Sequence, residues 1–327
     1  MSRMIDEGLF VDVHGVEQWI TLRGEHRDNP VLLMIPGPGA GFSALAPYFE
    51  SWERDYTLAQ WDQPRAGFTL AKHGGADTQP YTFERLARDG IAVAEIICRR
   101  LGVRRIIVLG LSGGTIVALN LVKQRPDLFS AYVGTGQIVD WARQDAEGYR
   151  LLLRRARANN DTTMLTELEG IGPPPYKDTA TDAIKSKYSG APTADEQRVM
   201  ATLFPVVFGR IMSPPHDAHY LAKGLALSDM RAAATAAYDA VREALIHFDA
   251  RRLGLDFEVP MFCLQGAEDL MTVNDDVRDY VNELRAPHKE LVLFEGCGHS
   301  AVFLRDAFLD KLNRHVRPAL ANAASSR

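Results

Sequence analysis

A serine flanked by glycines is the group in this sequence with the clearest capacity for nucleophilic chemistry. Ser112 lies in the segment Gly-Leu-Ser-Gly-Gly at residues 110–114, between a largely apolar run at 105–109 and a helix-like run at 115–122. This order predicts a strand, a sharp turn and a helix, with the serine at the turn, which is the arrangement of a nucleophile elbow. The flanking glycines lack a Cβ and allow the strand and the helix to approach closely. We therefore predict that the hydroxyl of Ser112 is held above a sheet, next to a helix N-terminus.

A serine hydroxyl is a weak nucleophile at neutral pH and needs an adjacent base. His299 follows the apolar run at 289–294, and Asp269 follows the apolar run at 259–265. Because the carboxyl ends of parallel strands lie at one edge of a sheet, both side chains are expected beside Ser112. We predict that His299 takes the proton of Ser112 and later gives it to the leaving group, while Asp269 orients the imidazole. Three other acids remain alternatives for this third role, namely Glu268, Asp275 and Asp140.

The oxyanion that forms during acyl transfer needs hydrogen-bond donors, and two glycines are placed to supply them. Gly113 would begin the helix after the serine, and Gly37 lies in the segment Pro-Gly-Pro-Gly-Ala-Gly at 36–41, directly after the apolar run 30–35. We predict that the backbone N–H groups of Gly37 and Gly113 form the oxyanion hole. Residues close to these segments, or at the end of the strand expected at 56–61, are predicted to line the substrate pocket: Pro38, Trp61, Gln63 and Leu111.

Together these segments resemble the proline iminopeptidase-type branch of the α/β-hydrolases. That branch carries an HGGPG-like oxyanion loop, a DQRGxG-like loop, a serine elbow, and an Asp and a His late in the chain. The corresponding segments here read Ile-Pro-Gly-Pro-Gly at 35–39 and Asp-Gln-Pro-Arg-Ala-Gly at 62–67, and the region 248–303 is also similar. The resemblance implies an α/β-hydrolase fold, with a mostly parallel eight-stranded sheet, helices on both faces and an inserted helical cap. It also implies a serine hydrolase that is proline iminopeptidase-like.

The type of bond that is cleaved is indicated more clearly than the substrate. A serine at the elbow favours an acyl-enzyme formed from an ester or amide, because dehalogenase or epoxide-opening chemistry uses a carboxylate nucleophile. The resemblance implies N-terminal prolyl or small aminoacyl amides. The alternative is a carboxylesterase, lactonase or aryl amidase without a free-amine requirement, since no segment between 140 and 250 matches the amine-binding motifs of the family. A non-catalytic ligand-binding protein on the same scaffold and a C–C bond hydrolase remain further alternatives.

The periodicity of apolar residues predicts how these groups are positioned. Residues 8–24 alternate in polarity and predict a hairpin of edge strands, and strand and helix patterns then alternate up to residue 139. This alternation predicts a parallel sheet with right-handed crossovers. From residue 140 only helix patterns occur, and we predict a helical cap inserted over the carboxyl edge of the sheet. The expected catalytic domain comprises residues 1–139 and 248–327, and the expected cap domain comprises residues 140–247.

Individual elements follow from the spacing of apolar residues and from capping residues. Helices are expected at 42–52, 82–101, 115–122, 141–159, 193–210, 229–247 and 301–318. Strands are expected at 30–35, 56–61, 105–109, 130–139, 259–265 and 289–294. A capping signal at Thr82 marks the start of the second helix, and Gly102 marks its end.

The overall composition excludes several classes of protein. The chain has 327 residues, 46% of them hydrophobic and 24% charged, which is typical of a globular protein long enough to bury a large core. Its net charge of −5 argues against nucleic acid as a partner. No apolar run approaches the roughly 18 residues of a membrane span. The N-terminal residues also lack the apolar core of a signal peptide, so we expect a cytoplasmic protein without a membrane partner.

No cofactor or metal is expected from the sequence. The three cysteines have spacings that fit no metal site, and we expect buried, reduced thiols at Cys98, Cys263 and Cys297. His216 and His219 are close enough to share a metal ion, but no third ligand accompanies them. The expected partner is therefore a small-molecule ester or amide, or a short peptide. The sequence does not indicate the oligomeric state.

Overall fold

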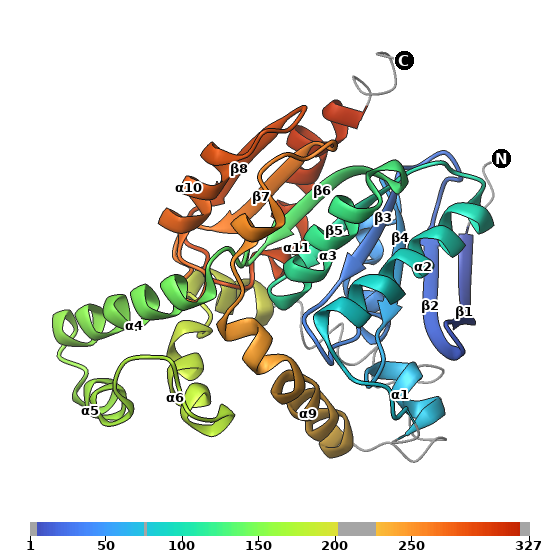
Figure 1. Ribbon diagram of the computed structural model, residues 1–327. Coiled ribbons are helices and arrows are strands. Elements are labelled where there is room, and N and C mark those ends of the chain that lie inside the picture. Colours follow the sequence, from blue (N-terminus) through green and yellow to red (C-terminus); the bar gives the residue numbers. More distant parts are fainter. Residues whose placement is uncertain (1–4, 75–76, 202–226, 321–327) are drawn as a thin grey trace.

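An eight-stranded sheet runs through the centre of the molecule (Figure 1). The computed structural model describes residues 5–74, 77–201 and 227–320. The strands lie in the order β1-β2-β4-β3-β5-β6-β7-β8. They are β1 Ile5–Val13, β2 Val16–Gly24, β3 Val31–Ile35, β4 Thr57–Asp62, β5 Ile106–Leu111, β6 Phe129–Thr135, β7 Met261–Gly266 and β8 Lys289–Phe294. Strand β2 pairs antiparallel with β1 and β4, and all other neighbours are parallel, which confirms the predicted mostly parallel sheet.

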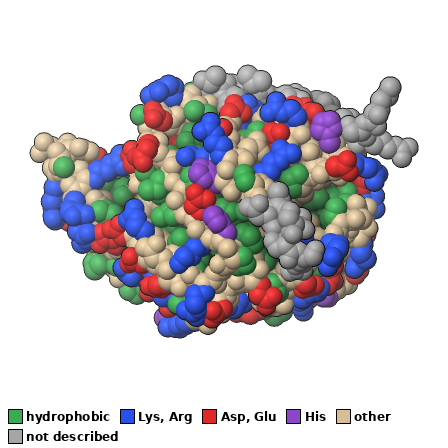
Figure 2. Space-filling view, turned by 90° about the horizontal axis from the view of Figure 1, so that it is seen from above, with side chains coloured by type: hydrophobic (Ala, Val, Ile, Leu, Met, Phe, Trp, Pro, Cys, Tyr) green, Lys and Arg blue, Asp and Glu red, His purple; other side chains and the backbone are tan. Residues whose placement is uncertain are grey.

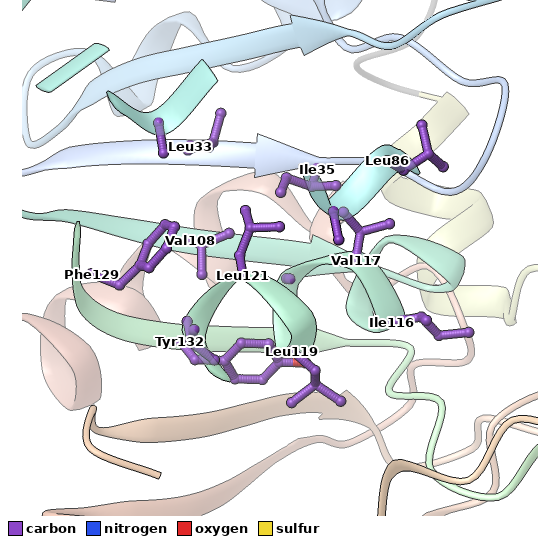
Figure 3. Packing of buried hydrophobic residues seen from close by; sticks show 14 of the residues in the cluster. Leu33, Ile35, Leu86, Val108, Ile116, Val117, Leu119, Leu121, Phe129 and Tyr132 are labelled. Carbon is purple, nitrogen blue, oxygen red and sulfur yellow. The ribbon is translucent and has the colours of Figure 1, made fainter. Parts of the chain in front are cut away.

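Helices cover both faces of this sheet, as the sequence predicts. They are α1 Gly67–His73, α2 Phe83–Leu101, α3 Gly113–Gln124, α10 Asn274–Glu283 and α11 Arg305–Lys311, the last followed by a π-helical turn, Leu312–Val316. All five residues of β3 are buried, and successive side chains join opposite hydrophobic clusters. Leu33 packs with residues of α2 and α3, as Figure 3 shows, whereas Leu32 belongs to the cluster that contains Phe308 of α11. Because neither face meets solvent, the strand is apolar throughout.

Helix α2 shows how local sequence sets the boundaries of an element. The hydroxyl of Thr82 accepts a hydrogen bond of 3.1 Å from the N–H of Arg85, which caps the helix N-terminus. Gly102 follows the last turn with a φ of 69°, in the left-handed region that glycine adopts at low cost. Both ends therefore agree with the helix predicted at 82–101.

Among the described residues between β6 and β7, the regular elements are helices joined by loops. Its helices include α4 Trp141–Ala158, α5 Thr162–Ile171, α6 Thr179–Ser189 and α9 Leu227–Ile246. Figure 1 shows them together at one end of the sheet. The sequence predicts α4 and α9 but not α5 and α6. These two are short, and each begins after an aspartate, Asp161 or Asp178, whose side chain accepts a hydrogen bond from a backbone N–H of the first turn.

Some predicted boundaries differ from the observed ones. Strand β6 ends at Thr135 instead of residue 139, because Gly136 turns the chain with a φ of 57°. The region 42–52 forms two short 3₁₀ helices instead of an α-helix, and a proline lies inside the first of them. The helix predicted at 193–210 begins at residue 194, and its part beyond 201 lies outside the described residues.

The surface carries charges of both signs. On the face seen in Figure 2, Lys and Arg side chains alternate with Asp and Glu side chains. Neither sign of charge dominates this face. Within the described ranges, none of the helices combines the length and the hydropathy needed to cross a membrane.

Gly114 sets the distance between α3 and the sheet, and its replacement is expected to destabilise the protein. A Cβ on Gly114 would lie 2.1 Å from the carbonyl oxygen of Ile35 and 2.6 Å from that of Pro36. Because both are backbone atoms, we expect Gly114→Ala to lower the free energy of unfolding by about 3 kcal/mol, as overpacking does. Urea denaturation measures this change. Gly170→Ala in α5 is the control, since its Cβ would meet no atom within 4 Å, and equal unfolding midpoints for the two variants would refute the expectation.

Candidate active site

Ser112 lies at the turn between β5 and α3, as predicted. Its φ of 52° and ψ of −124° fall in a region that non-glycine residues rarely adopt. The close contact between strand and helix explains this conformation, because a Cβ on Gly110 would lie 2.8 Å from the carbonyl oxygen of Gly114. Such backbone strain is typical of functional turns. The turn exposes the serine side chain to a cavity above the sheet.

The structure brings His299 and Asp269 together with Ser112 in one chain of hydrogen bonds. The Nε2 atom of His299 lies 3.0 Å from the Oγ of Ser112, and its Nδ1 donates to Oδ2 of Asp269 at 3.0 Å. His299 follows β8 and Asp269 follows β7, so each side chain comes from the strand end that the sequence indicates. The imidazole also packs against the Cα of Gly136, where any Cβ would lie 2.7 Å from the ring. This arrangement can pass a proton from the serine to the imidazole.

Asp269 is buried and held by four further hydrogen bonds. Its Oδ1 accepts from the N–H groups of Met271 and Thr272 at 2.8 and 2.9 Å. Its Oδ2 accepts from the Thr272 hydroxyl at 2.6 Å and from Gln265 Nε2 at 2.8 Å. Burial by itself would raise the pKa of Asp269, but the charge and hydrogen bond of His299 and the two hydrogen bonds from Thr272 lower it below its usual value. The carboxylate is therefore kept ionised beside the imidazole.

The other acids considered from the sequence have different partners. Asp275 is exposed and forms an ion pair with Arg278, and Asp140 caps the N-terminus of α4. Glu268 uses its backbone N–H to bind the carbonyl oxygen of Cys297. Asp269 is the carboxylate that contacts His299.

The pKa of His299 is raised above its ordinary value. Burial acts in the opposite direction, since it disfavours the charged imidazolium. The charge of Asp269 and its hydrogen bond outweigh burial, the charge of Glu196 adds to the increase, and Lys185 opposes it. The charged form of the imidazole is thus stabilised, as a proton acceptor in acyl transfer requires.

Gly37 and Gly113 lie beside Ser112 at the wall of the cavity. A Cβ on Gly37 would be 3.8 Å from the N atom of Gly113, so the two backbone segments are close neighbours. A Cβ on Gly113 would approach the ring of Pro38 to 2.6 Å, which requires glycine at this position. Within the described part of the chain, neither N–H group donates to a protein acceptor. Both remain available to a ligand oxygen.

Gln63 and Tyr81 support the loop that contains Gly37. Gln63 donates from Nε2 to the carbonyl oxygen of Pro36 at 3.0 Å. The hydroxyl of Tyr81 donates to Oε1 of Gln63 at 3.3 Å and accepts from the N–H of Gly39 at 2.7 Å. The sequence predicts that Gln63 lines the pocket, but its side chain is fully buried and supports the loop from beneath.

A cavity of about 350 Å³ opens at Ser112. Of the four residues predicted to line it, Pro38 does so. The other three are not among its lining residues. Trp61 and Gln63 are fully buried at the end of β4, where Trp61 donates its indole N–H to Gln18. Leu111 packs at the edge of the hydrophobic cluster on the α11 face. The apolar lining comes instead from α2, the link before α4, the inserted helices and the loop after β7: Phe83, Ile138, Trp141, Val241, Leu245 and Met271. These positions become neighbours only in the folded chain.

Asp182 of α6 is the charged side chain among the described residues that line the cavity. Its Oδ2 accepts a hydrogen bond of 3.2 Å from the hydroxyl of Tyr238 on α9. Burial raises the pKa of Asp182, and the nearby Asp145 adds to this increase, against the opposing effect of Lys185. Lys185 itself is buried and forms an ion pair with Asp145. No pattern in the sequence points to Asp182, because the spacing of apolar residues does not predict its helix.

No group of three or more His, Cys, Asp or Glu residues in the described ranges is arranged to hold a metal ion. His216 and His219 lie outside those ranges. The three cysteines are free thiols and all are buried.

Comparison with known proteins defines the class of this chain. Residues 30–306 match the alpha/beta hydrolase fold family, so the chain belongs to that family and is a hydrolase. It is 24% identical over 316 residues to a Bacillus subtilis (strain 168) protein named "Probable aminopeptidase YbaC", and the match covers 94% of this chain and 95% of the relative.

Two solved structures illustrate the range of proteins with this fold. The proline iminopeptidase-related protein TTHA1809 from Thermus thermophilus is 18% identical, with a TM-score of 0.60 over 96% of this chain and 99% of its own. Est816, an N-acyl homoserine lactone degrading enzyme, is 16% identical, with a TM-score of 0.57 over 94% of this chain and 99% of its own. At these identities the likeness concerns the fold.

Proposed function

We propose that the protein is a serine hydrolase that cleaves an ester or amide bond through an acyl-enzyme on Ser112. The observation that carries this proposal is the hydrogen-bonded series from Ser112 Oγ through His299 to Asp269, with 3.0 Å at each step. The series opens on a cavity whose wall also contains Gly37 and Gly113. A nucleophile, a base, an orienting acid and candidate oxyanion donors are thus within reach of one carbonyl group.

In the proposed mechanism, His299 Nε2 removes the proton of Ser112 as Oγ attacks the substrate carbonyl. The N–H groups of Gly37 and Gly113 bind the oxyanion, and the charge of Asp269 stabilises the imidazolium. His299 then gives its proton to the leaving alcohol or amine, and the C–O or C–N bond breaks. A water molecule then attacks the acyl-enzyme carbonyl while the same imidazole takes its proton. The bond between the acyl carbon and Oγ breaks, His299 returns the proton to Oγ, and the acid is released.

Residues 140–247 act in this proposal as a cap domain over a catalytic domain made of residues 1–139 and 248–327. The support is that side chains from the insertion line the cavity together with Ser112, namely Trp141 of α4, Ser186 of α6 and Val241 of α9. Such a cap limits the access of bulk solvent to the reacting groups and sets the shape of the acyl group that fits.

The favoured substrate is an amide of a small apolar amino acid with a free amine, such as an N-terminal prolyl amide. A buried carboxylate is costly unless a positive charge compensates it, and Asp182 lines a cavity whose other described lining residues are uncharged. An ammonium group on the substrate would supply that charge. The volume of about 350 Å³ is at the small end of ligand pockets, which suits a small acyl group.

The second candidate is a carboxylesterase, lactonase or aryl amidase with no free-amine requirement. The apolar lining from Phe83, Val241 and Leu245 favours it, because these side chains would accept an uncharged acyl chain equally well. The two candidates share the machinery at Ser112 and differ in the role of Asp182.

Asp182→Asn separates these candidates. If Asp182 binds the amine, this substitution should reduce kcat/KM for a prolyl arylamide by about 10- to 100-fold, the cost of losing a charged hydrogen bond. Turnover of N-acetylprolyl arylamide and of simple aryl esters should change little. Glu169→Gln on the exposed surface of α5 is the matched control for the loss of one cap charge. Equal wild-type turnover of free and N-acetylated substrates would favour the second candidate.

A further inference from the structure

A buried glutamate outside the cavity lies against the loop that carries His299. Glu196 is 1% exposed and belongs to the inserted segment between β6 and β7. Its Oε1 accepts a hydrogen bond of 3.3 Å from Sγ of Cys297, a thiol that is fully buried two residues before His299. The proton transfer proposed above makes no use of this carboxylate.

Thr193 and Glu196 form a capping box at the start of the helix that begins at residue 194. The N–H of Glu196 donates to the hydroxyl of Thr193 at 3.2 Å, and the N–H of Thr193 donates to Oε2 of Glu196 at 2.7 Å. A capping box satisfies two backbone donors at a helix N-terminus. Here both capping side chains also bond outward: the hydroxyl of Thr193 donates to the carbonyl oxygen of Gly296 at 2.6 Å.

The loop before His299 is shaped to receive this helix start. Gly296 has a φ of 68°, and a Cβ on Gly298 would lie 3.2 Å from Oε2 of Glu196. On its other side the loop contacts the end of β7, where a Cβ on Gly266 would lie 1.8 Å from the carbonyl oxygen of Gly298. The loop is therefore held between the sheet and the inserted helix.

We propose that Glu196 is a positioning residue for His299, and that the helix start at Thr193 holds the base loop in register with Ser112. This inference rests on the proposed serine hydrolase function. The carboxylate binds the loop through the Cys297 thiol and Thr193 binds it through Gly296, so displacement of the helix would move the imidazole away from the Ser112 hydroxyl. Glu196 does not touch the substrate and is not a catalytic residue.

The charge of Glu196 also acts on the imidazole. The groups that face His299 are Asp269 after β7, Glu196 on the inserted segment and Lys185 on α6, with the neutral thiol of Cys297 on its own loop. Asp269 and Glu196 favour the imidazolium, and Lys185, which is paired with Asp145, disfavours it. Removal of the Glu196 charge is thus expected to make the imidazolium less stable.

The test compares Glu196→Gln, Glu196→Ala and Thr193→Val with wild type by the rate at which a fluorophosphonate labels Ser112 across pH. Glu196→Gln keeps the size and an acceptor but loses the charge, so the acid limb of the labelling rate should move to lower pH. Glu196→Ala and Thr193→Val remove contacts to the loop, and the maximal rate should fall about tenfold or more, as small misplacements of reacting groups do.

Asp195→Asn is the matched control. It removes the same charge from the neighbouring residue, whose exposed carboxylate pairs with Arg198 and lies beside Gly296 but is not among the groups that shift the pKa of His299. If the pH profile of labelling for Glu196→Gln equals those of wild type and of Asp195→Asn, the inference is wrong. This outcome can be read even if Glu196→Ala fails to fold. A loss confined to free-amine substrates, with unchanged labelling, would assign Glu196 to substrate binding and also overturn it. Absence of labelling in wild type would instead refute the serine hydrolase proposal itself.

Discussion

Ser112→Ala is expected to lower kcat by about 10⁴- to 10⁶-fold on any ester or amide that the wild-type protein hydrolyses, the usual effect of removing an activated serine. The reason is that Oγ of Ser112 is the only protein atom that forms a covalent bond to the substrate carbonyl carbon in the proposed mechanism. A steady-state assay with an activated aryl ester measures the loss. Substrate binding should survive, because the cavity lining is unchanged.

The backbone of Ser112 supplies an independent check on this prediction. Its φ of 52° is strained for alanine and serine but not for glycine. Ser112→Gly should therefore be more stable than Ser112→Ala by about 1 kcal/mol, within the range that such strain costs, and both should be inactive. If Ser112→Ala kept more than a few per cent of the activity while correctly folded, another nucleophile would have to be sought.

Asp269→Asn is expected to reduce kcat by about 10⁴-fold and to shift its pH dependence. His299 accepts a proton only when neutral, so activity should rise as pH increases through the pKa of His299. The charge of Asp269 raises that pKa, and its removal should move the acid limb of the profile to lower pH. The maximal kcat would be low because the imidazole is no longer oriented and its cation is no longer stabilised.

The control for this prediction is Asp275→Asn, which removes an exposed carboxylate that forms an ion pair with Arg278. It should retain the wild-type rate and pH profile. An acid limb for Asp269→Asn at the wild-type position would show that Asp269 does not interact with the titrating group, whatever the loss in kcat.

The reacting groups could be predicted because their signals are local. Ser112 stands between glycines that only a tight strand-to-helix turn requires, and Asp269 and His299 each follow an apolar strand of a parallel sheet. Strand ends of such a sheet share one edge, so three distant segments could be brought together without knowledge of the packing. The sheet and the main helices were predictable for the same reason.

The walls of the cavity could not be predicted, because they depend on tertiary contacts. Asp182 and Tyr238 line the cavity from inserted helices whose sequence does not reveal which side faces Ser112. The contact of Glu196 with the loop of His299 depends on tertiary packing in the same way. Trp61 and Gln63 show that a position at a strand end does not decide whether a side chain lines the cavity. Their place at the end of β4 suggested a pocket, but both side chains turn into the protein, where Gln63 supports the loop of Gly37.

The most direct test of the proposed function is intact mass after exposure to a fluorophosphonate. Wild type, Ser112→Ala and His299→Ala are compared under conditions in which all three are folded. The proposal predicts one adduct per wild-type chain, none on Ser112→Ala, and much slower labelling of His299→Ala because the serine then lacks its base. No adduct on folded wild type, or an adduct that persists on Ser112→Ala, would contradict the proposal and favour a ligand-binding role or another nucleophile.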